Sequence, residues 1–133
     1  MKIAVVAANG RVAGRLITEA VNRGFELTAF GRGENKTDAK NYVQKDLFDL
    51  TAEDLKGFDA VVDAFGAWTE DTLPQHSSSL SHLCDILSGT DTRLLVVGGA
   101  GSLYVNPEHS AQLTDGPDFP DAFKPLAAAM AKA

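Results

Sequence analysis

The stretch that decides the fold is Ile3-Ala4-Val5-Val6-Ala7-Ala8-Asn9-Gly10-Arg11-Val12-Ala13-Gly14, near the start of the chain. Its first six residues are a continuous run of small apolar side chains, which is typical of a strand covered on both faces. Apolar residues then recur at helical spacing from Arg11 to Arg23. Gly24 predicts the end of that helix, because glycine adopts a left-handed conformation easily.

The same order of strand and helix recurs along the chain. A brief helix is predicted to start at Thr51, and another to cover the apolar stripe of residues 80–87. Further strands are predicted at residues 26–30, 42–44, 60–65 and 94–97. Strands that alternate with helices form βαβ crossovers, which give a parallel sheet with helices on both faces. We therefore expect an α/β fold of the Rossmann type, with strand order 3-2-1-4-5 and residues 1–133 in one domain.

Composition excludes several classes of protein. The chain has 133 residues with 44% hydrophobic and 23% charged side chains, which argues against a disordered protein. Its formal net charge of -6 argues against general nucleic-acid binding, and no apolar run approaches the ~20 residues of a membrane span. The single cysteine, Cys84, excludes an internal disulfide and favours a cytoplasmic location.

No metal site is expected. His76, His82 and Cys84 have a spacing that does not place three ligands on one helix face. Cys84 falls on the apolar stripe of its helix, so we interpret it as a buried small hydrophobic residue.

The loop between the first strand and the first helix is the candidate phosphate site. A pyrophosphate there would accept hydrogen bonds from free N–H groups at the helix N-terminus, and small residues would let the backbone approach it. Of the three key positions only Gly10 is glycine, with Ala7 and Ala13 at the others. Tight packing of helix on strand is the alternative explanation of these small residues.

The end of the second strand bears on the choice of nucleotide. An acidic residue there would bind the ribose 2′-hydroxyl of NAD, whereas an arginine accommodates the 2′-phosphate of NADP. The strand ends in Phe30-Gly31-Arg32, which favours NADP(H) over NAD(H). Arg11, in the phosphate loop, is a second candidate for the same phosphate. For both arginines a solvated surface side chain is the alternative.

Residues 1–13, 59–66 and, most distinctively, Leu94-Leu95-Val96-Val97-Gly98-Gly99-Ala100-Gly101-Ser102-Leu103 resemble the NmrA-like NAD(P)-binding proteins. These are atypical short-chain dehydrogenase/reductases, often described as NADH–flavin reductases. The resemblance covers essentially the whole chain, although Ala7 and Asn9 replace the family's glycine and threonine. The cofactor-binding residues that it implies are Ala7, Asn9, Gly10, Arg11, Val12, Arg32, Asp46, Leu47, Phe65, Gly66, Ala67, Gly98 and Gly99.

The chemistry predicted from the sequence is hydride transfer. The Tyr-x-x-x-Lys pair of ordinary short-chain dehydrogenases is absent, because Asp46 and Glu108 follow the two tyrosines at that spacing. Transfer to a flavin asks less of the protein, since the cofactor carries the chemistry. We therefore predict an NAD(P)H-dependent oxidoreductase acting on FMN, FAD, a quinone or a similar planar acceptor, with Ser102 and Tyr104 as candidate catalytic residues. A non-catalytic NADP(H)-binding redox sensor is the alternative.

The resemblance also implies a longer chain, with a sixth strand and helices on the substrate side. The helix-forming segment 125–133 ends without a terminator, so the sequence predicts truncation after the fifth strand and its helix. The fifth strand would then form an exposed edge where a homodimer could pair. A truncated product without activity is a third possibility.

Overall fold

The computed structural model describes residues 1–133, which form two compact units. The first, here called the sheet unit, comprises residues 1–66 and 79–97. The second, here called the loop unit, comprises residues 67–78 and 98–133.

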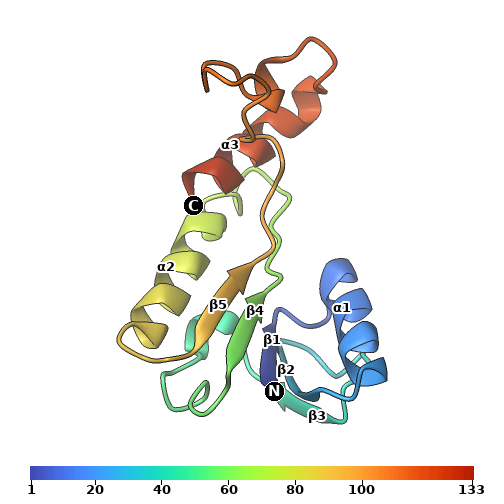
Figure 1. Ribbon diagram of the computed structural model, residues 1–133. Coiled ribbons are helices and arrows are strands. Elements are labelled where there is room, and N and C mark those ends of the chain that lie inside the picture. The colour runs from blue at the N-terminus through green and yellow to red at the C-terminus, as the bar shows by residue number, and fades with distance from the viewer. The chain divides into compact units, whose positions relative to one another are not determined.

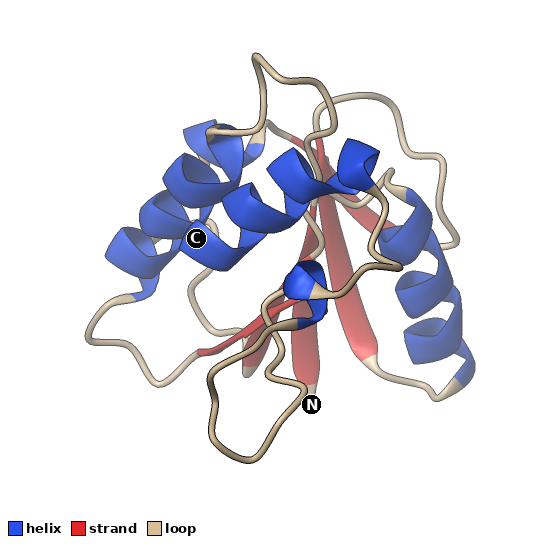
Figure 2. Cartoon of the chain, turned by 90° about the horizontal axis from the view of Figure 1, so that it is seen from above, coloured by secondary structure: helices blue, strands red, loops and turns tan.

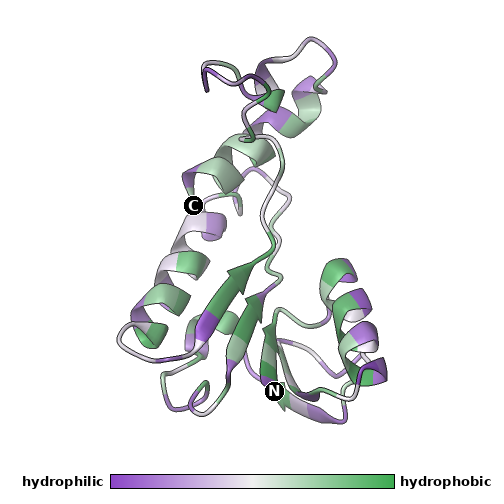
Figure 3. Ribbon diagram, in the orientation of Figure 1, coloured by the Kyte–Doolittle hydropathy of each residue, from purple (hydrophilic) through white to green (hydrophobic).

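A parallel five-stranded sheet forms the centre of the sheet unit (Figure 1). Its strands are β1 (Lys2–Val6), β2 (Glu26–Gly31), β3 (Asn41–Gln44), β4 (Ala60–Asp63) and β5 (Arg93–Val96). The order is β3-β2-β1-β4-β5, which confirms both the predicted fold class and the predicted order. In Figure 3 the strands near the centre of the sheet are predominantly hydrophobic, as expected of a sheet that is covered on both faces.

The two faces of the sheet have separate apolar cores. On one face Val5 and Val62, which are paired in register, pack with Ala13 and Ile17 of α1 (Arg11–Asn22). On the other face Ala4 and Val61 belong to a core that includes Leu83 and Leu87 of α2 (Gln75–Leu87). Helices therefore lie on both sides of the strands, as the view from above also shows (Figure 2).

Residues 52–57 form turns, so the brief helix predicted from Thr51 is wrong. The expected capping contacts are nevertheless present: the Thr51 N–H donates to Asp54 Oδ2 at 2.8 Å, and the Asp54 N–H donates to Thr51 Oγ1 at 3.4 Å. Gly57 follows with a φ of 80°, which turns the chain toward β4 before a second helical turn forms.

The interpretation of Cys84 as a buried residue is also wrong, because its side chain is exposed. The buried stripe of α2 instead runs through Ser79, Leu83 and Leu87, which are four residues apart. Cys84 lies next to that stripe in sequence, and a single step of about 100° around the helix carries it to solvent.

Strand β5 forms one edge of the sheet, as predicted. Leu95 and Val96 are 46% and 48% exposed although they belong to a strand. Pairing of this edge with a second copy stays a prediction. None of the helices combines the length and apolar composition that crossing a membrane would require.

The loop unit contains α3 (Lys124–Lys132) and two short 3-10 helices, η2 (Leu113–Asp115) and η3 (Asp121–Phe123). Gly101 lies between α3 and η2: a Cβ added to it would be 2.9 Å from Ala127 Cβ of α3 and 2.9 Å from Thr114 Cγ2 of η2. Real Cβ atoms essentially never approach so closely, so glycine lets the segment after β5 pack on α3.

The carboxyl group of Asp54 gives the stability of the sheet unit a pH dependence. Hydrogen bonds from Lys45 Nζ and from the Thr51 N–H hold the pKa of this carboxyl below its ordinary value of 3.8. A lowered carboxyl pKa adds stability above the ordinary value, and that stability is lost as pH falls through the lowered pKa. We expect Asp54→Asn to lower the free energy of unfolding by about 1 kcal/mol at pH 7, and by less below about pH 4.

Urea unfolding at several pH values measures this difference. Glu53→Gln is the matched control, because Glu53 and its partner Lys56 are both largely exposed and such pairs contribute little. A loss of stability in Asp54→Asn that is the same at pH 3 and pH 7 would contradict the assignment.

Candidate functional site

The loop that joins β1 to α1 is a tight turn made by the backbone. The Gly10 N–H donates to the Ala7 carbonyl at 3.1 Å, and the Ala8 N–H donates to the Phe30 carbonyl at 2.9 Å. A Cβ added to Gly10 would be 3.3 Å from the Ala7 oxygen, closer than nine in ten real Cβ contacts. The loop is therefore fixed to the end of β2 and has little room for a side chain at position 10.

Ala7 has a φ of 56°, in the left-handed region that glycine prefers. At this position the family that the sequence resembles has glycine. The backbone conformation is thus kept although the residue differs, and alanine carries a strain of about 1 kcal/mol there.

The N-terminus of α1 is open to an anion. Its N-cap is Gly10, which has no side chain to accept from the free N–H groups, and its first turn has no acidic residue. Arg11 and Val12 are exposed beside it. The first N–H groups of a helix lack partners within the helix, and its dipole favours negative charge at this end. This geometry suits a phosphate group.

Beyond β2, residues 32–40 form a loop held by hydrogen bonds on both sides. Asn9 Nδ2 donates to the Glu34 carbonyl at 2.9 Å, and Asn9 Oδ1 accepts from the Lys36 N–H at 3.0 Å. At its far end, the loop is bonded to α1 through Thr18 and Asp38. The loop is therefore joined to the turn between β1 and α1.

Arg32 stands at the start of this loop with its side chain 84% exposed. Its Nε lies 3.9 Å from Asp46 Oδ2, while Asp46 Oδ1 accepts a hydrogen bond from the Phe48 N–H at 2.9 Å. Asp46 thus caps the short 3-10 helix η1 (Leu47–Asp49), and Leu47 is buried. The structure brings two of the predicted site residues together here and leaves the guanidinium of Arg32 accessible.

At the end of β4, Asp63 is a buried acid whose carboxylate accepts a hydrogen bond from the Phe65 N–H at 2.9 Å. The ring of Phe65 meets that of Phe48 edge to face, with 6.4 Å between centroids. Phe65 and Gly66 therefore leave the sheet through a turn that Asp63 fixes.

The remaining predicted cofactor residues belong to the loop unit. Ala67 is buried, and its carbonyl oxygen lies 3.0 Å from Nε2 of the buried His76. Gly98 and Gly99 are exposed. A Cβ added to Gly99 would be 3.1 Å from the Met130 sulfur, so this glycine lies close to α3.

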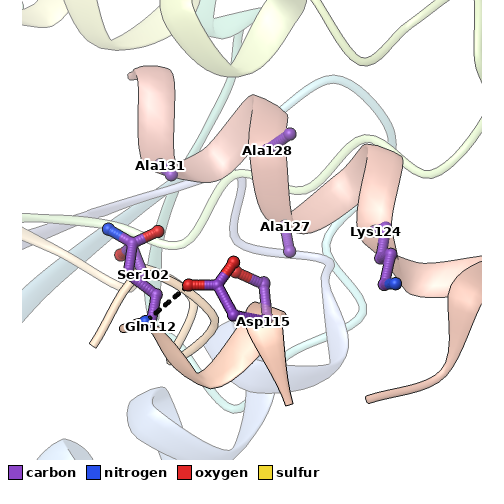
Figure 4. A pocket seen from close by; sticks show the side chains of 8 residues that line it. Ser102, Gln112, Asp115, Lys124, Ala127, Ala128 and Ala131 are labelled. Carbon is purple, nitrogen blue, oxygen red and sulfur yellow. Dashed lines mark hydrogen bonds between the residues drawn. The ribbon is translucent and has the colours of Figure 1, made fainter. Parts of the chain in front are cut away.

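The two candidate catalytic residues have different surroundings. Ser102 lines a cavity of about 670 Å³ in the loop unit. Figure 4 shows its wall of α3 alanines and the polar side that includes Gln112 and Asp115. Tyr104 does not line this cavity; its ring stacks on that of His109, with centroids 4.8 Å apart. Their catalytic roles stay predictions.

The sequence predicts Tyr42 as a strand residue that lacks the lysine of a Tyr-x-x-x-Lys pair, and it gives Tyr42 no role in the site. In the structure its hydroxyl donates to the Gly33 carbonyl at 2.7 Å and accepts from Asn9 Nδ2 at 3.0 Å. In the sequence, the sign of this contact is the glycine at position 31. Its reason appears in the structure, where a Cβ at this position would be 2.3 Å from the Tyr42 hydroxyl. The pairing of β2 with β3, which places Gly31 next to Gln44, is needed to see this.

Comparison with known proteins places these features in a family. A family model described as NAD(P)H-binding matches residues 7–133. The chain is also similar to a solved structure described as "SP1627, a putative NADH-flavin reductase, from Streptococcus pneumoniae TIGR4", with a TM-score of 0.94 and 56% identity. That similarity covers 98% of this chain and 62% of the other.

Two further relatives have no function in their names. The Lmo0794 protein from Listeria monocytogenes is 46% identical with a TM-score of 0.67, over 78% of this chain and 63% of its own. The "Uncharacterized protein YwnB" of Bacillus subtilis (strain 168) is 40% identical over 129 residues, which are 96% of this chain and 61% of that protein. The chain therefore spans less than two thirds of the length of these relatives.

The left-handed conformation of Ala7 can be tested by mutation. We expect Ala7→Gly to raise the free energy of unfolding by up to about 1 kcal/mol, because glycine adopts this conformation without strain. Ala8→Gly is the control: Ala8 is fully buried and has no positive φ, so its substitution should lower stability. Urea unfolding measures both, and a loss of stability in Ala7→Gly would refute the strain.

Proposed function

Because the chain belongs to the NAD(P)H-binding family, we propose that it binds NADP(H) and supports hydride transfer to a flavin, a quinone or a similar planar acceptor. The observation that carries the proposal is the turn from β1 into α1, which ends in an uncapped helix N-terminus. Parallel sheets bind nucleotides at the carboxyl ends of their strands, at the point where the strand order reverses, and here that point is β1.

The pyrophosphate is assigned to the first turn of α1. Backbone N–H groups of Arg11 and Val12 lie at the positive end of the helix, and Gly10 leaves the approach free of a side chain. Arg11 adds a positive charge on the surface of the same turn. Negative charge is therefore stabilised here by both the backbone and a side chain.

The adenosine end is assigned to Arg32 and the residues after β3. The Arg32 guanidinium is largely exposed and presents several N–H donors, which match the oxygens of a ribose 2′-phosphate. Asp46 and Leu47 would lie beside the adenine, and Phe65, Gly66 and Ala67 would line the cofactor after β4. Gly98 and Gly99 would lie near the nicotinamide.

Reduction of an acceptor fits the side chains better than dehydrogenation of an alcohol. The Tyr-x-x-x-Lys pair is absent, and a similar solved structure carries the description "putative NADH-flavin reductase". The nicotinamide supplies the hydride when it is bound, so the chain has to orient the cofactor and exclude water. Ser102 is a candidate to hydrogen-bond the nicotinamide or the acceptor. Tyr104 is a candidate to pack over the bound acceptor. We assign residues 1–133 as the cofactor-holding domain.

Calorimetric titration of NADPH and NADH into the chain and into Val12→Glu tests the phosphate site. Val12 is half exposed in the first turn of α1, so a carboxylate there costs little packing and repels a bound pyrophosphate. We expect nucleotide affinity to fall about tenfold or more in Val12→Glu, while the melting temperature holds or rises.

Asn22→Glu is the control, because it adds the same charge at the other end of α1. It should leave nucleotide affinity unchanged. If neither nucleotide binds to the unmodified chain, the proposed function fails. If nucleotide binds but the absorbance at 340 nm is not lost with FMN, FAD or quinones, the redox-sensor function replaces the reductase.

The role of Arg32 gives a separate prediction. We expect Arg32→Ala to weaken NADPH about tenfold or more and NADH by much less, because only NADPH carries the 2′-phosphate. Arg23→Ala removes an arginine at the end of α1 and should affect neither nucleotide. Equal loss of affinity for NADPH and NADH in Arg32→Ala would refute the assignment.

A further inference from the structure

Four consecutive backbone carbonyls, from Gly31 to Glu34, are each held by a hydrogen bond. The Lys45 N–H donates to the Gly31 oxygen at 2.9 Å, and Gln44 Nε2 donates to the Arg32 oxygen at 3.2 Å. Tyr42 Oη and Asn9 Nδ2 donate to the next two oxygens, at 2.7 Å and 2.9 Å. The backbone that carries Arg32 is therefore fixed on both sides of that residue, although its side chain is exposed.

Asn9 and Tyr42 form the centre of this arrangement. The two N–H groups of the Asn9 amide are used by the Glu34 oxygen and the Tyr42 hydroxyl, and its oxygen accepts from the Lys36 N–H. A threonine hydroxyl, which the resembled family has at this position, has one donor and cannot make the same three contacts. The replacement at position 9 therefore joins the phosphate loop to the loop that carries Arg32.

Gly31 is the third part of this cluster. A Cβ at position 31 would be 2.3 Å from the Tyr42 hydroxyl and 3.3 Å from Asn9 Nδ2. The tyrosine hydroxyl therefore occupies the space that any other residue at position 31 would fill. The tyrosine ring packs against the apolar core on the α1 side of the sheet, and this packing fixes the position of the hydroxyl at the end of the ring.

We propose that Asn9 and Tyr42 are positioning residues that set the selectivity for NADPH over NADH by holding the Arg32 loop in register with the phosphate loop. This inference rests on the proposed function. A guanidinium whose backbone is already ordered loses less conformational entropy when it pairs with a phosphate, so preorganisation increases affinity. The gain applies only to the nucleotide with a phosphate at that end, which makes selectivity the quantity to measure.

Tyr42→Phe is the sharpest test, because it removes the hydroxyl and keeps the ring that packs on the sheet. We expect the ratio of the dissociation constants of NADH and NADPH to fall about fivefold, which corresponds to the loss of one hydrogen bond. The affinity for NADH itself should stay nearly constant. Calorimetric titration of both nucleotides gives the ratio.

Two further variants separate positioning from general loosening of the loop. In an Arg32→Ala background, Tyr42→Phe should have no further effect on the ratio, because it acts through Arg32. Thr18→Val is the matched control: it removes a hydroxyl bond to Asp38 at the far end of the same loop and should leave the ratio unchanged.

The outcomes distinguish this inference from the proposed function. If the unmodified chain binds neither nucleotide, the proposed function fails and the inference fails with it. If the unmodified chain prefers NADPH but Tyr42→Phe lowers the affinity for both nucleotides equally, only the inference is overturned. An effect of Tyr42→Phe that persists in the Arg32→Ala background overturns it as well.

Discussion

Strand β1 is paired on both sides, and the rest of the sheet unit depends on those two sets of backbone hydrogen bonds. Its register with β2 places Val6 beside Phe30, and its register with β4 places Val6 beside Asp63. The strand order reverses at β1, because the chain runs from β1 to β2 and β3 on one side and then continues with β4 and β5 on the other. The loop that leaves β1 therefore lies at the point of reversal, where a turn can meet a ligand with its backbone.

The turn from β1 into α1 combines a strained backbone at Ala7 with a helix N-terminus that a ligand can reach. Ala7 has a left-handed φ, and Gly10 closes the turn where a side chain would press on the Ala7 oxygen. The cost is local, whereas the result is an uncapped helix N-terminus with no acidic residue in its first turn. Anion binding at this end would offset the strain, since both the free N–H groups and the helix dipole favour negative charge.

Neighbouring loops acquire their geometry from side chains far apart in the sequence. Asn9 and Tyr42 are separated by 33 positions, yet their hydrogen bond connects the phosphate loop with the loop after β2. The Asp46 carboxylate likewise caps η1 and faces Arg32. The part of the site assigned to the adenosine is thus built by strand pairing, which brings the ends of β2 and β3 together.

The sequence by itself determined the fold class, because small apolar runs, helical periodicity and glycine stops are local patterns that survive without the rest of the chain. The strand order followed from that fold class, and the family followed from the resemblance of quoted segments such as residues 94–103. It misjudged Cys84, whose exposure is decided by its position on the helix face, and the segment after Thr51, where Gly57 turns the chain toward β4 before a second helical turn forms. Only the tertiary structure revealed the contacts among Asn9, Gly31 and Tyr42. Hydrogen bonds between side chains depend on register and rotamer, and neither is written in the spacing of residues along one strand.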